Sequence, residues 1–347
     1  MANGKMTAVV KAAPGPGAEL RTVAIPEPGE GQVLVKVKVT SICGSDLHIY
    51  KWNSWAAQHV HPPQIIGHEV AGEVVKLGPG VKSLQVGDFI SAETHIPCGY
   101  CKQCRTGNMH ICKNLKILGV DTNGAFAEYV VIPEIVAWKN DPSIPPEFAS
   151  VQEPLGNAID TVLSEDVAGK RVAIIGAGPI GMLAVGVARA AGASDIFVTD
   201  LNDYRLEIAK KMGATVTLNP NKVDALQVVL EATHGDGVDV VLEMSGNANA
   251  LIQGCQMLTP GGRISLLGVF DNPVTMEFNN LIIFKAIRVY GITGRKMFST
   301  WEKAGNLLRS KKLDLSPVIT HQLKLADFER GFELMKSGQC GKIVLHV

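Results

Sequence analysis

Four cysteines lie within fifteen positions of this 347-residue chain, at Cys98, Cys101, Cys104 and Cys112. The two-residue gaps let the loop fold back on one ion, and the fourth thiolate completes a tetrahedral set. Zinc prefers such soft ligands, and four protein ligands leave no open position for catalysis. Disulfide pairing is disfavoured because the chain has seven cysteines, an odd number, of which these four are clustered. A [4Fe–4S] cluster is a weaker alternative, since no ferredoxin-like repetition surrounds them. The cluster therefore predicts a structural zinc site in a lobe spanning residues 98–112.

A second set of candidate metal ligands is spread along the first half of the chain. Cys43 lies in a Cys-Gly-Ser-Asp segment, His68 and Glu69 lie in Gly-His-Glu, and Glu153 lies in Gln-Glu-Pro-Leu. Each is weak evidence alone, because a lone buried cysteine is usually inert. Together, one thiolate, one imidazole and a carboxylate make an open zinc site of the catalytic type. Whether Glu69 or Glu153 completes this site stays open.

A glycine-rich turn lies near the middle of the chain. Residues 176–181 read Gly-Ala-Gly-Pro-Ile-Gly, after an apolar strand expected at 171–175 and at the start of a helix expected at 179–191. In this context the first glycine permits a tight turn, the second admits a pyrophosphate, and the third lets helix and strand pack closely. The helix N-terminus favours the phosphates. The predicted dinucleotide contacts are Gly176, Gly178, Pro179, Ile180 and Gly181.

Asp200 indicates which dinucleotide binds. It ends the next expected strand, at 195–200. A carboxylate at this place binds the adenosine ribose hydroxyls and repels a 2′-phosphate, which predicts NAD rather than NADP. Arg205 is either a ribose or adenine contact or a solvated helix residue. Strand carboxyl ends also bind dinucleotides, and the candidates for the nicotinamide side are Leu267, Gly268, Val269, Ile292 and Thr293.

The organisation of the chain favours two domains at this length. Residues 5–140 read as short strands and turns, whereas strands alternate with helices from residue 170 on, which predicts a parallel sheet. The formal net charge is zero, which argues against a nucleic-acid partner or an anionic membrane surface. No signal-peptide pattern opens the chain, and the apolar stretch 172–188 is interrupted by glycines. We therefore expect a cytoplasmic protein with no membrane span.

Taken in order, the Cys-Gly-x-Asp segment, Gly-His-Glu-x-x-Gly, the four-cysteine lobe and the glycine turn resemble the zinc-containing medium-chain alcohol dehydrogenase family over nearly the whole chain. The resemblance implies an α/β architecture with a GroES-like β-barrel catalytic domain at 1–155. It further implies a Rossmann cofactor domain with a doubly wound parallel sheet at 156–294, and a C-terminal segment, 295–347, that returns to the catalytic domain. The family also implies NAD, a homotetramer and two zinc ions per chain, of which one is catalytic, at Cys43 and His68, and one structural.

Five segments resemble one branch of this family, whose members oxidise L-threonine at its 3-hydroxyl. They are residues 43–50, 93–99, 152–157, 278–285 and 290–295. The branch implies a proton relay from Ser45, where threonine is more usual, to His48. It places Glu153 at the zinc or at the substrate ammonium, and His95 in the substrate pocket. The alternatives are local packing for His48 and a surface loop for His95.

Three alternative functions fit these motifs to different degrees. A zinc-dependent butanediol or sorbitol dehydrogenase shares both metal sites and NAD. A metal-free relative that acts on quinones has no use for Cys43, His68 and the cysteine lobe. A non-catalytic NAD-binding structural protein has no use for an open metal site.

Overall fold

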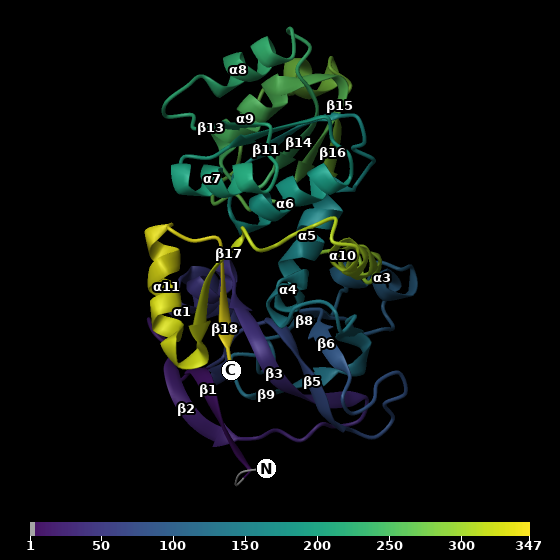
Figure 1. Ribbon diagram of the computed structural model, residues 1–347, viewed down its shortest axis with the longest axis vertical. Helices are drawn as coiled ribbons and strands as arrows, with labels where there is room; N and C mark the ends of the chain where they lie inside the picture. Colours follow the sequence, from purple (N-terminus) through teal and green to yellow (C-terminus); the bar gives the residue numbers. More distant parts are fainter. Residues whose placement is uncertain (1–3) are drawn as a thin grey trace. The chain divides into compact units, whose positions relative to one another are not determined.

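The structure is a computed structural model that describes residues 4–347 (Figure 1). The chain divides into two compact units. Unit 1 comprises Met1–Glu153, Lys296–Arg309 and Ile319–Val347, and unit 2 comprises Pro154–Arg295 and Ser310–Val318. Within the described residues, no helix combines the length and the apolar character that crossing a bilayer requires.

Unit 1 is built mainly from β-strands. Its largest sheet has the order β10-β6-β5-β3-β18-β17, with β9 also paired to β3, and smaller sheets have the orders β2-β1-β4 and β7-β8. The strands are β1 (Lys5–Lys11), β2 (Glu19–Ala24), β3 (Gln32–Ile42), β4 (Gln64–Ile65), β5 (Glu69–Leu77), β6 (Phe89–Ala92), β7 (His95–Ile96), β8 (Lys116–Ile117), β9 (Tyr129–Pro133), β10 (Ala137–Lys139), β17 (Ile319–Lys324) and β18 (Lys342–His346). The helices are α1 (Gly44–Lys51), α2 (Ser54–His59), α3 (Lys102–Arg105), α4 (Pro146–Ser150), α10 (Ser299–Arg309) and α11 (Phe328–Ser337), and α5 (Gln152–Val162) runs across the boundary with unit 2.

The alternation of apolar and polar residues in β3 explains its place in this sheet. Val33, Val35 and Val37 are buried, whereas Lys36 and Lys38 are exposed. The middle of the strand therefore presents one face to the core, as its period of two residues predicts, whereas residues 39–42 are buried on both faces.

The last strand of unit 1 comes from the far end of the chain. β18 pairs antiparallel with β3 and parallel with β17. Figure 1 shows β18 beside both strands. Some 300 residues separate β18 from β3 in the sequence, and the Lys342 ammonium of β18 donates a hydrogen bond to the Ile42 carbonyl of β3. The largest sheet of unit 1 is therefore completed only by residues 342–346.

Unit 2 contains a six-stranded sheet with the order β13-β12-β11-β14-β15-β16, in which every pairing is parallel. This confirms the parallel sheet predicted from the alternation of strands and helices. In chain order the arrangement is 3-2-1-4-5-6, with helices as crossovers, as expected for a doubly wound fold. The strands are β11 (Arg171–Ile175), β12 (Asp195–Thr199), β13 (Val216–Leu218), β14 (Val238–Glu243), β15 (Leu258–Leu266) and β16 (Arg288–Gly291), and the helices are α6 (Pro179–Ala190), α7 (Asp203–Lys211), α8 (Ala225–Ala232), α9 (Ala248–Met257) and a π-helix at Asn279–Ile283.

Two local expectations differ from the structure. The strand expected at 263–269 begins five residues earlier, at Leu258, and ends at Leu266. Its Gly261-Gly262 pair suggests a turn, but both glycines lie inside the strand, where the pairing with β14 shifts register. The β-rich first segment also contains α1 and α2, whose N-termini are capped by polar side chains. Asn53 is the N-cap of α2, and Asp46, inside the first turn of α1, accepts from the backbone N–H of its N-cap, Cys43.

Candidate metal centres and cofactor site

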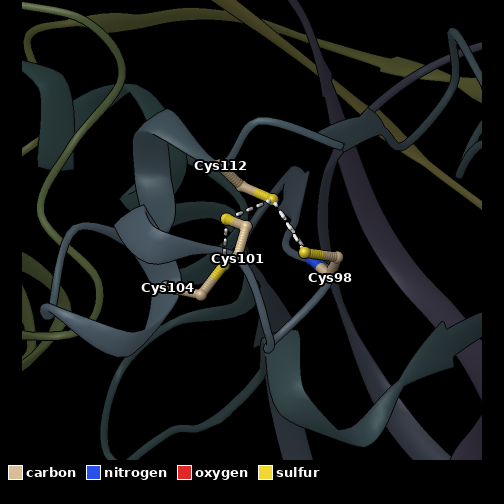
Figure 2. A group of neighbouring side chains, drawn as sticks. All are labelled: Cys98, Cys101, Cys104 and Cys112. Carbon is tan, nitrogen blue, oxygen red and sulfur yellow. Dashed lines mark hydrogen bonds between the residues drawn. The ribbon is translucent and has the colours of Figure 1, made fainter.

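The four clustered cysteines converge on one point. Their side chains point toward one another (Figure 2), with sulfur–sulfur distances of 3.4 Å for Cys101–Cys104, 3.7 Å for Cys101–Cys112 and 3.5 Å for Cys98–Cys112. A tetrahedral zinc ion with Zn–S bonds of about 2.3 Å places its sulfurs roughly 3.8 Å apart. The observed spacing fits such an ion and is too long for a disulfide. The pair β7–β8 joins the two ends of this lobe.

The four thiols differ in their acidity. Although burial acts in the opposite direction, backbone amides of Tyr100 and Cys101 lower the pKa of Cys98 to about 6. Burial, together with the neighbouring sulfurs, raises the pKa of Cys104 to about 12. A shared cation is what allows all four to be thiolates together, since metal binding displaces the thiol protons.

The second centre joins Cys43, His68 and Glu69. One ligand atom of each lies within 4.8 Å of the others. Cys43 directly precedes α1, and Glu69 opens β5, which pairs with β3. A thiolate, an imidazole and a carboxylate match the three protein ligands of an open zinc site.

Asp46 orients two of these ligands. Its buried carboxylate accepts a hydrogen bond from the Cys43 backbone N–H at 2.9 Å and lies 3.4 Å from Nδ1 of His68. This leaves Nε2 of His68 as the metal-facing nitrogen, in the carboxylate–histidine arrangement common around zinc. Burial opposes a charged ring, but Asp46 raises the pKa of His68 well above its usual value. The negative charge of Asp46 would likewise stabilise a metal cation bound to the His68 ring.

Glu69 is held by Lys342 from β18. Both side chains are buried, and Oε2 of Glu69 accepts from the Lys342 ammonium and from the Ser41 hydroxyl. Burial raises the pKa of Glu69, although Lys342 acts in the opposite direction. The other oxygen, Oε1, is buried and has no hydrogen-bond partner among residues 4–347. An orphaned carboxylate oxygen beside Cys43 and His68 fits the role of a metal ligand, because a buried charge needs a partner.

The remaining predicted residues of this region take different places. Glu153 lies outside the group of three ligand atoms, yet its charge acts to raise the pKa of Glu69. Ser45 and His48 lie on α1, three residues apart, which puts them on the same face. Asn53 donates to Nδ1 of His48 at 2.9 Å, and the ring is exposed. No hydrogen bond joins Ser45 to His48 in the described chain, so a relay between them needs a bridging group.

His95 is held by a buried carboxylate. Glu93 accepts from Nδ1 of His95 at 3.0 Å and from the indole N–H of Trp301 at 2.8 Å. Glu93 is fully buried, whereas His95 keeps part of its surface. The ring is therefore fixed at Nδ1, which favours an oriented group over a mobile surface histidine.

The glycine turn has the geometry of a phosphate cradle. Gly176 has a positive φ of 97°, and a Cβ at Gly181 would lie 2.0 Å from the Gly176 carbonyl oxygen, so neither position accepts a side chain. A Cβ at Gly178 would meet nothing within 4 Å. The space that this missing Cβ leaves, at the N-terminus of α6, fits a pyrophosphate.

The turn lies on a cavity of about 750 Å³ at the carboxyl ends of β11, β12 and β14. Asp200 is locked there, because its two oxygens accept the backbone N–H groups of Ala177 and Asn202 at 2.7 and 2.8 Å. Arg205 also lines the cavity, and its buried Nε has no hydrogen-bond partner in the part of the chain that the structure describes. Leu267, Gly268 and Val269 follow the end of β15, and Ile292 and Thr293 follow the end of β16.

Comparison with known proteins decides the family. Residues 29–142 match the alcohol dehydrogenase GroES-like domain and residues 179–310 match the zinc-binding dehydrogenase domain. The chain is 56% identical over 341 residues, 98% of either chain, to a protein of Pyrococcus horikoshii named L-threonine 3-dehydrogenase. This chain belongs to the zinc-binding alcohol dehydrogenase family. The GroES-like and Rossmann-type fold predicted from the sequence is thereby confirmed.

Solved structures of other dehydrogenases share the fold of this dehydrogenase. An enzyme from E. coli CFT073 described as a short chain alcohol dehydrogenase, complexed with NADH, has a TM-score of 0.91 at 28% identity and covers 99% of this chain and 100% of its own. A 2R,3R-butanediol dehydrogenase from Bacillus subtilis has a TM-score of 0.90 at 29% identity, with 99% of each chain covered.

Three residues of the dehydrogenase site escaped the sequence analysis. Asp46 stands in the Cys-Gly-Ser-Asp segment, three residues from Cys43, so a capping-box pattern was available to find it. Glu93 lies two residues before His95, where a buried acid beside a histidine is a weaker signal. The sequence around Lys342 gives no indication of its role, because its partner, Glu69, lies 273 positions away in the chain.

We expect Cys104→Ser to empty the structural centre of the dehydrogenase. A hydroxyl is a poor replacement for a buried thiolate, and zinc binding supplies folding free energy to such lobes. The variant should lose about one zinc ion per chain, measured by elemental analysis, and limited proteolysis should cut within residues 98–112. Cys255→Ser is the matched control, because Cys255 is equally buried and lies in unit 2. Full zinc content in Cys104→Ser would contradict the assignment.

Proposed function

We propose that this dehydrogenase oxidises L-threonine at its 3-hydroxyl to L-2-amino-3-oxobutanoate and reduces NAD to NADH, with a catalytic and a structural zinc ion. The observation that carries the proposal is the Cys43, His68 and Glu69 group in a chain 56% identical to a named L-threonine 3-dehydrogenase. The orphaned Oε1 of Glu69 and the open space at Gly178 support the zinc and the dinucleotide respectively.

The chemistry divides between the bound groups and the chain. When bound, zinc would lower the pKa of a substrate hydroxyl, and NAD would accept the hydride from the carbinol carbon. Cys43, His68 and Glu69 would hold the metal, and Asp46 orients Cys43 and His68. Glu153 would exchange with Glu69 at the metal or hold the substrate ammonium. Ser45 takes the hydroxyl proton and passes it through a bridging group toward His48, which delivers it to solvent. His95, fixed by Glu93, contacts the substrate.

A substrate panel tests this function. The rate of NAD reduction is measured with L-threonine, L-serine, 2,3-butanediol, sorbitol and ethanol. We expect L-threonine to give the highest kcat/KM. If 2,3-butanediol or sorbitol exceeds it, the enzyme is a polyol dehydrogenase of the same family, and if no alcohol is oxidised the catalytic assignment fails.

The relay is tested at His48. We expect His48→Ala to lower kcat about tenfold to a hundredfold at neutral pH, with a smaller loss at high pH where hydroxide takes the proton. His59→Ala is the control, because His59 is also exposed and lies on the next helix. An unchanged kcat across the pH range would remove His48 from the mechanism.

Asp200 is proposed to select NAD. Its locked carboxylate repels a 2′-phosphate, so Asp200→Ala should raise the NADP-to-NAD ratio of kcat/KM by about a hundredfold. Asp203→Ala is the control, since that carboxylate is exposed and pairs with Lys222. Equal kcat/KM for NADP and NAD in the wild-type enzyme would contradict the role of Asp200. Arg205 then becomes the phosphate contact.

We also propose a cytoplasmic homotetramer. β16 pairs with β15 on one side only in the described chain. Val289 of this strand and Phe284 before it are exposed, as are Phe278 and Ile283 of the preceding segment. An unpaired strand edge with apolar neighbours is a common place for another chain to pair. Light scattering after gel filtration reads the mass directly, and a monomeric mass would refute the assembly.

A further inference from the structure

Glu243 carries a buried carboxylate that the proposed mechanism does not use. It ends β14, and the residue has no exposed surface. Its Oε1 accepts hydrogen bonds from the Ser245 and Gly246 backbone N–H groups at 2.8 and 2.9 Å, and from the Ser245 hydroxyl. Three donors therefore converge on this one oxygen, as in charge-assisted hydrogen bonds to a carboxylate.

The second oxygen of Glu243 is unsatisfied. Oε2 is buried without a hydrogen-bond partner, and within residues 4–347 no lysine, arginine or histidine forms an ion pair with Glu243. A Cβ on Gly268 would lie 2.4 Å from this oxygen and 2.3 Å from the Gly246 nitrogen. The carboxylate is therefore closed in by the backbone that follows β14 and β15. A buried charge without a cation is costly, so its retention calls for a physical reason.

The position in the sheet supplies a reason. In a 3-2-1-4-5-6 sheet, each half of three strands binds one mononucleotide at the strand carboxyl ends. Asp200 follows β12 in the first half, which takes the adenosine. Glu243 ends β14, the first strand of the second half, which takes the nicotinamide nucleotide. The adjacent Ser245 lines the 750 Å³ cavity that holds the glycine turn.

We propose that the uncompensated charge of Glu243 selects the redox state of the cofactor, favouring NAD⁺ over NADH. The inference rests on the proposed NAD-linked function and concerns unit 2 alone. The nicotinamide ring is a pyridinium cation in NAD⁺ and is neutral in NADH, while the rest of the molecule is the same. A fixed negative charge in a region of low dielectric therefore stabilises one form and not the other. When bound, the oxidised ring would act as a counter-charge for Glu243 from within the cavity that Ser245 lines.

The test measures the dissociation constants of NAD⁺ and NADH by calorimetry, without substrate, on the zinc-loaded enzyme. Glu243→Gln keeps an oxygen to accept from Ser245 and Gly246 and removes the charge. We expect the ratio Kd(NAD⁺)/Kd(NADH) to rise about tenfold. Glu243→Asp retains the charge and should keep the wild-type ratio. Asp239→Asn, four residues earlier on the same strand and roughly 13 Å away, removes a charge at the amino end and should also leave the ratio unchanged.

Each outcome decides the matter. A Glu243→Gln ratio equal to that of the wild type, or equal weakening of both cofactors, would show that Glu243 serves the fold only and would overturn the inference. A Glu243→Gln chain that does not fold without cofactor would overturn it as well, because the apo fold would then need the charge. If the wild-type enzyme binds neither NAD⁺ nor NADH, the proposed function itself fails, an outcome distinct from an unchanged ratio.

Discussion

Cys43→Ala is expected to lower the rate of NAD reduction by more than about a thousandfold, because it removes a proposed ligand of the metal that is proposed to activate the substrate hydroxyl. The group of Cys43, His68 and Glu69 has only three protein ligand atoms within 4.8 Å of one another. Losing the thiolate leaves one imidazole and one carboxylate, too few to retain zinc in a site that must also admit substrate. Kinetic assay and elemental analysis together check the prediction, with zinc falling to about one ion per chain.

The control for this variant is Cys255→Ala. Both cysteines are free thiols, but Cys255 belongs to a buried apolar cluster in unit 2. Its removal should leave kcat and zinc content unchanged. NADH binding should survive in both variants, which separates a lost metal from a lost fold. Substantial activity in zinc-depleted Cys43→Ala would place the chemistry elsewhere.

Lys342→Met should reduce the free energy of unfolding by about 3–5 kcal/mol, since it leaves the buried Glu69 carboxylate without its cation. Lys342 and Glu69 are 2% and 0% exposed, and the ammonium also donates to the Ile42 carbonyl at 2.9 Å. Urea denaturation of the metal-free enzyme gives the value directly. The double variant Glu69→Gln with Lys342→Met should recover most of the loss, because no buried charge then remains unpaired.

A surface ion pair provides the comparison. Lys38 and Glu73 lie 3.0 Å apart with side chains 45% and 41% exposed. Lys38→Met should therefore change the free energy of unfolding by less than about 1 kcal/mol. Similar losses for the two lysine variants would mean that the pair at Glu69 is hydrated and contributes no more than a surface contact.

The parts of this molecule that could be predicted from the sequence are those encoded within a few residues. The cysteine lobe, the glycine turn and the strand before it each have a spacing that reports directly on local geometry. The parallel sheet could also be predicted, because alternating strands and helices leave few topologies. Assignment of the substrate depends on resemblance, since no spacing of residues encodes it.

What the sequence could not reveal depends on contacts between distant segments. Lys342 contacts Glu69 only because β18 pairs with β3. The sequence around Lys342 contains no pattern that predicts this pairing. The isolation of Glu243 arises from two loops, after β14 and β15, whose glycines allow backbone to approach backbone. Sequence patterns identify candidate ligands by residue type. They cannot identify Glu243, because its distinguishing property is the absence of a cationic side chain nearby in the fold.

The late arrival of β18 has a consequence for how the enzyme is made. Ribosomes add about 5–20 residues per second, so roughly 15 to 60 seconds separate the emergence of Cys43 from that of Lys342. During this interval the nascent polypeptide already carries its thiolate and imidazole but lacks the cation that restrains Glu69. The buried pair of Glu69 and Lys342 therefore forms only near the end of translation, whereas all four cysteines of the lobe have been added by residue 112.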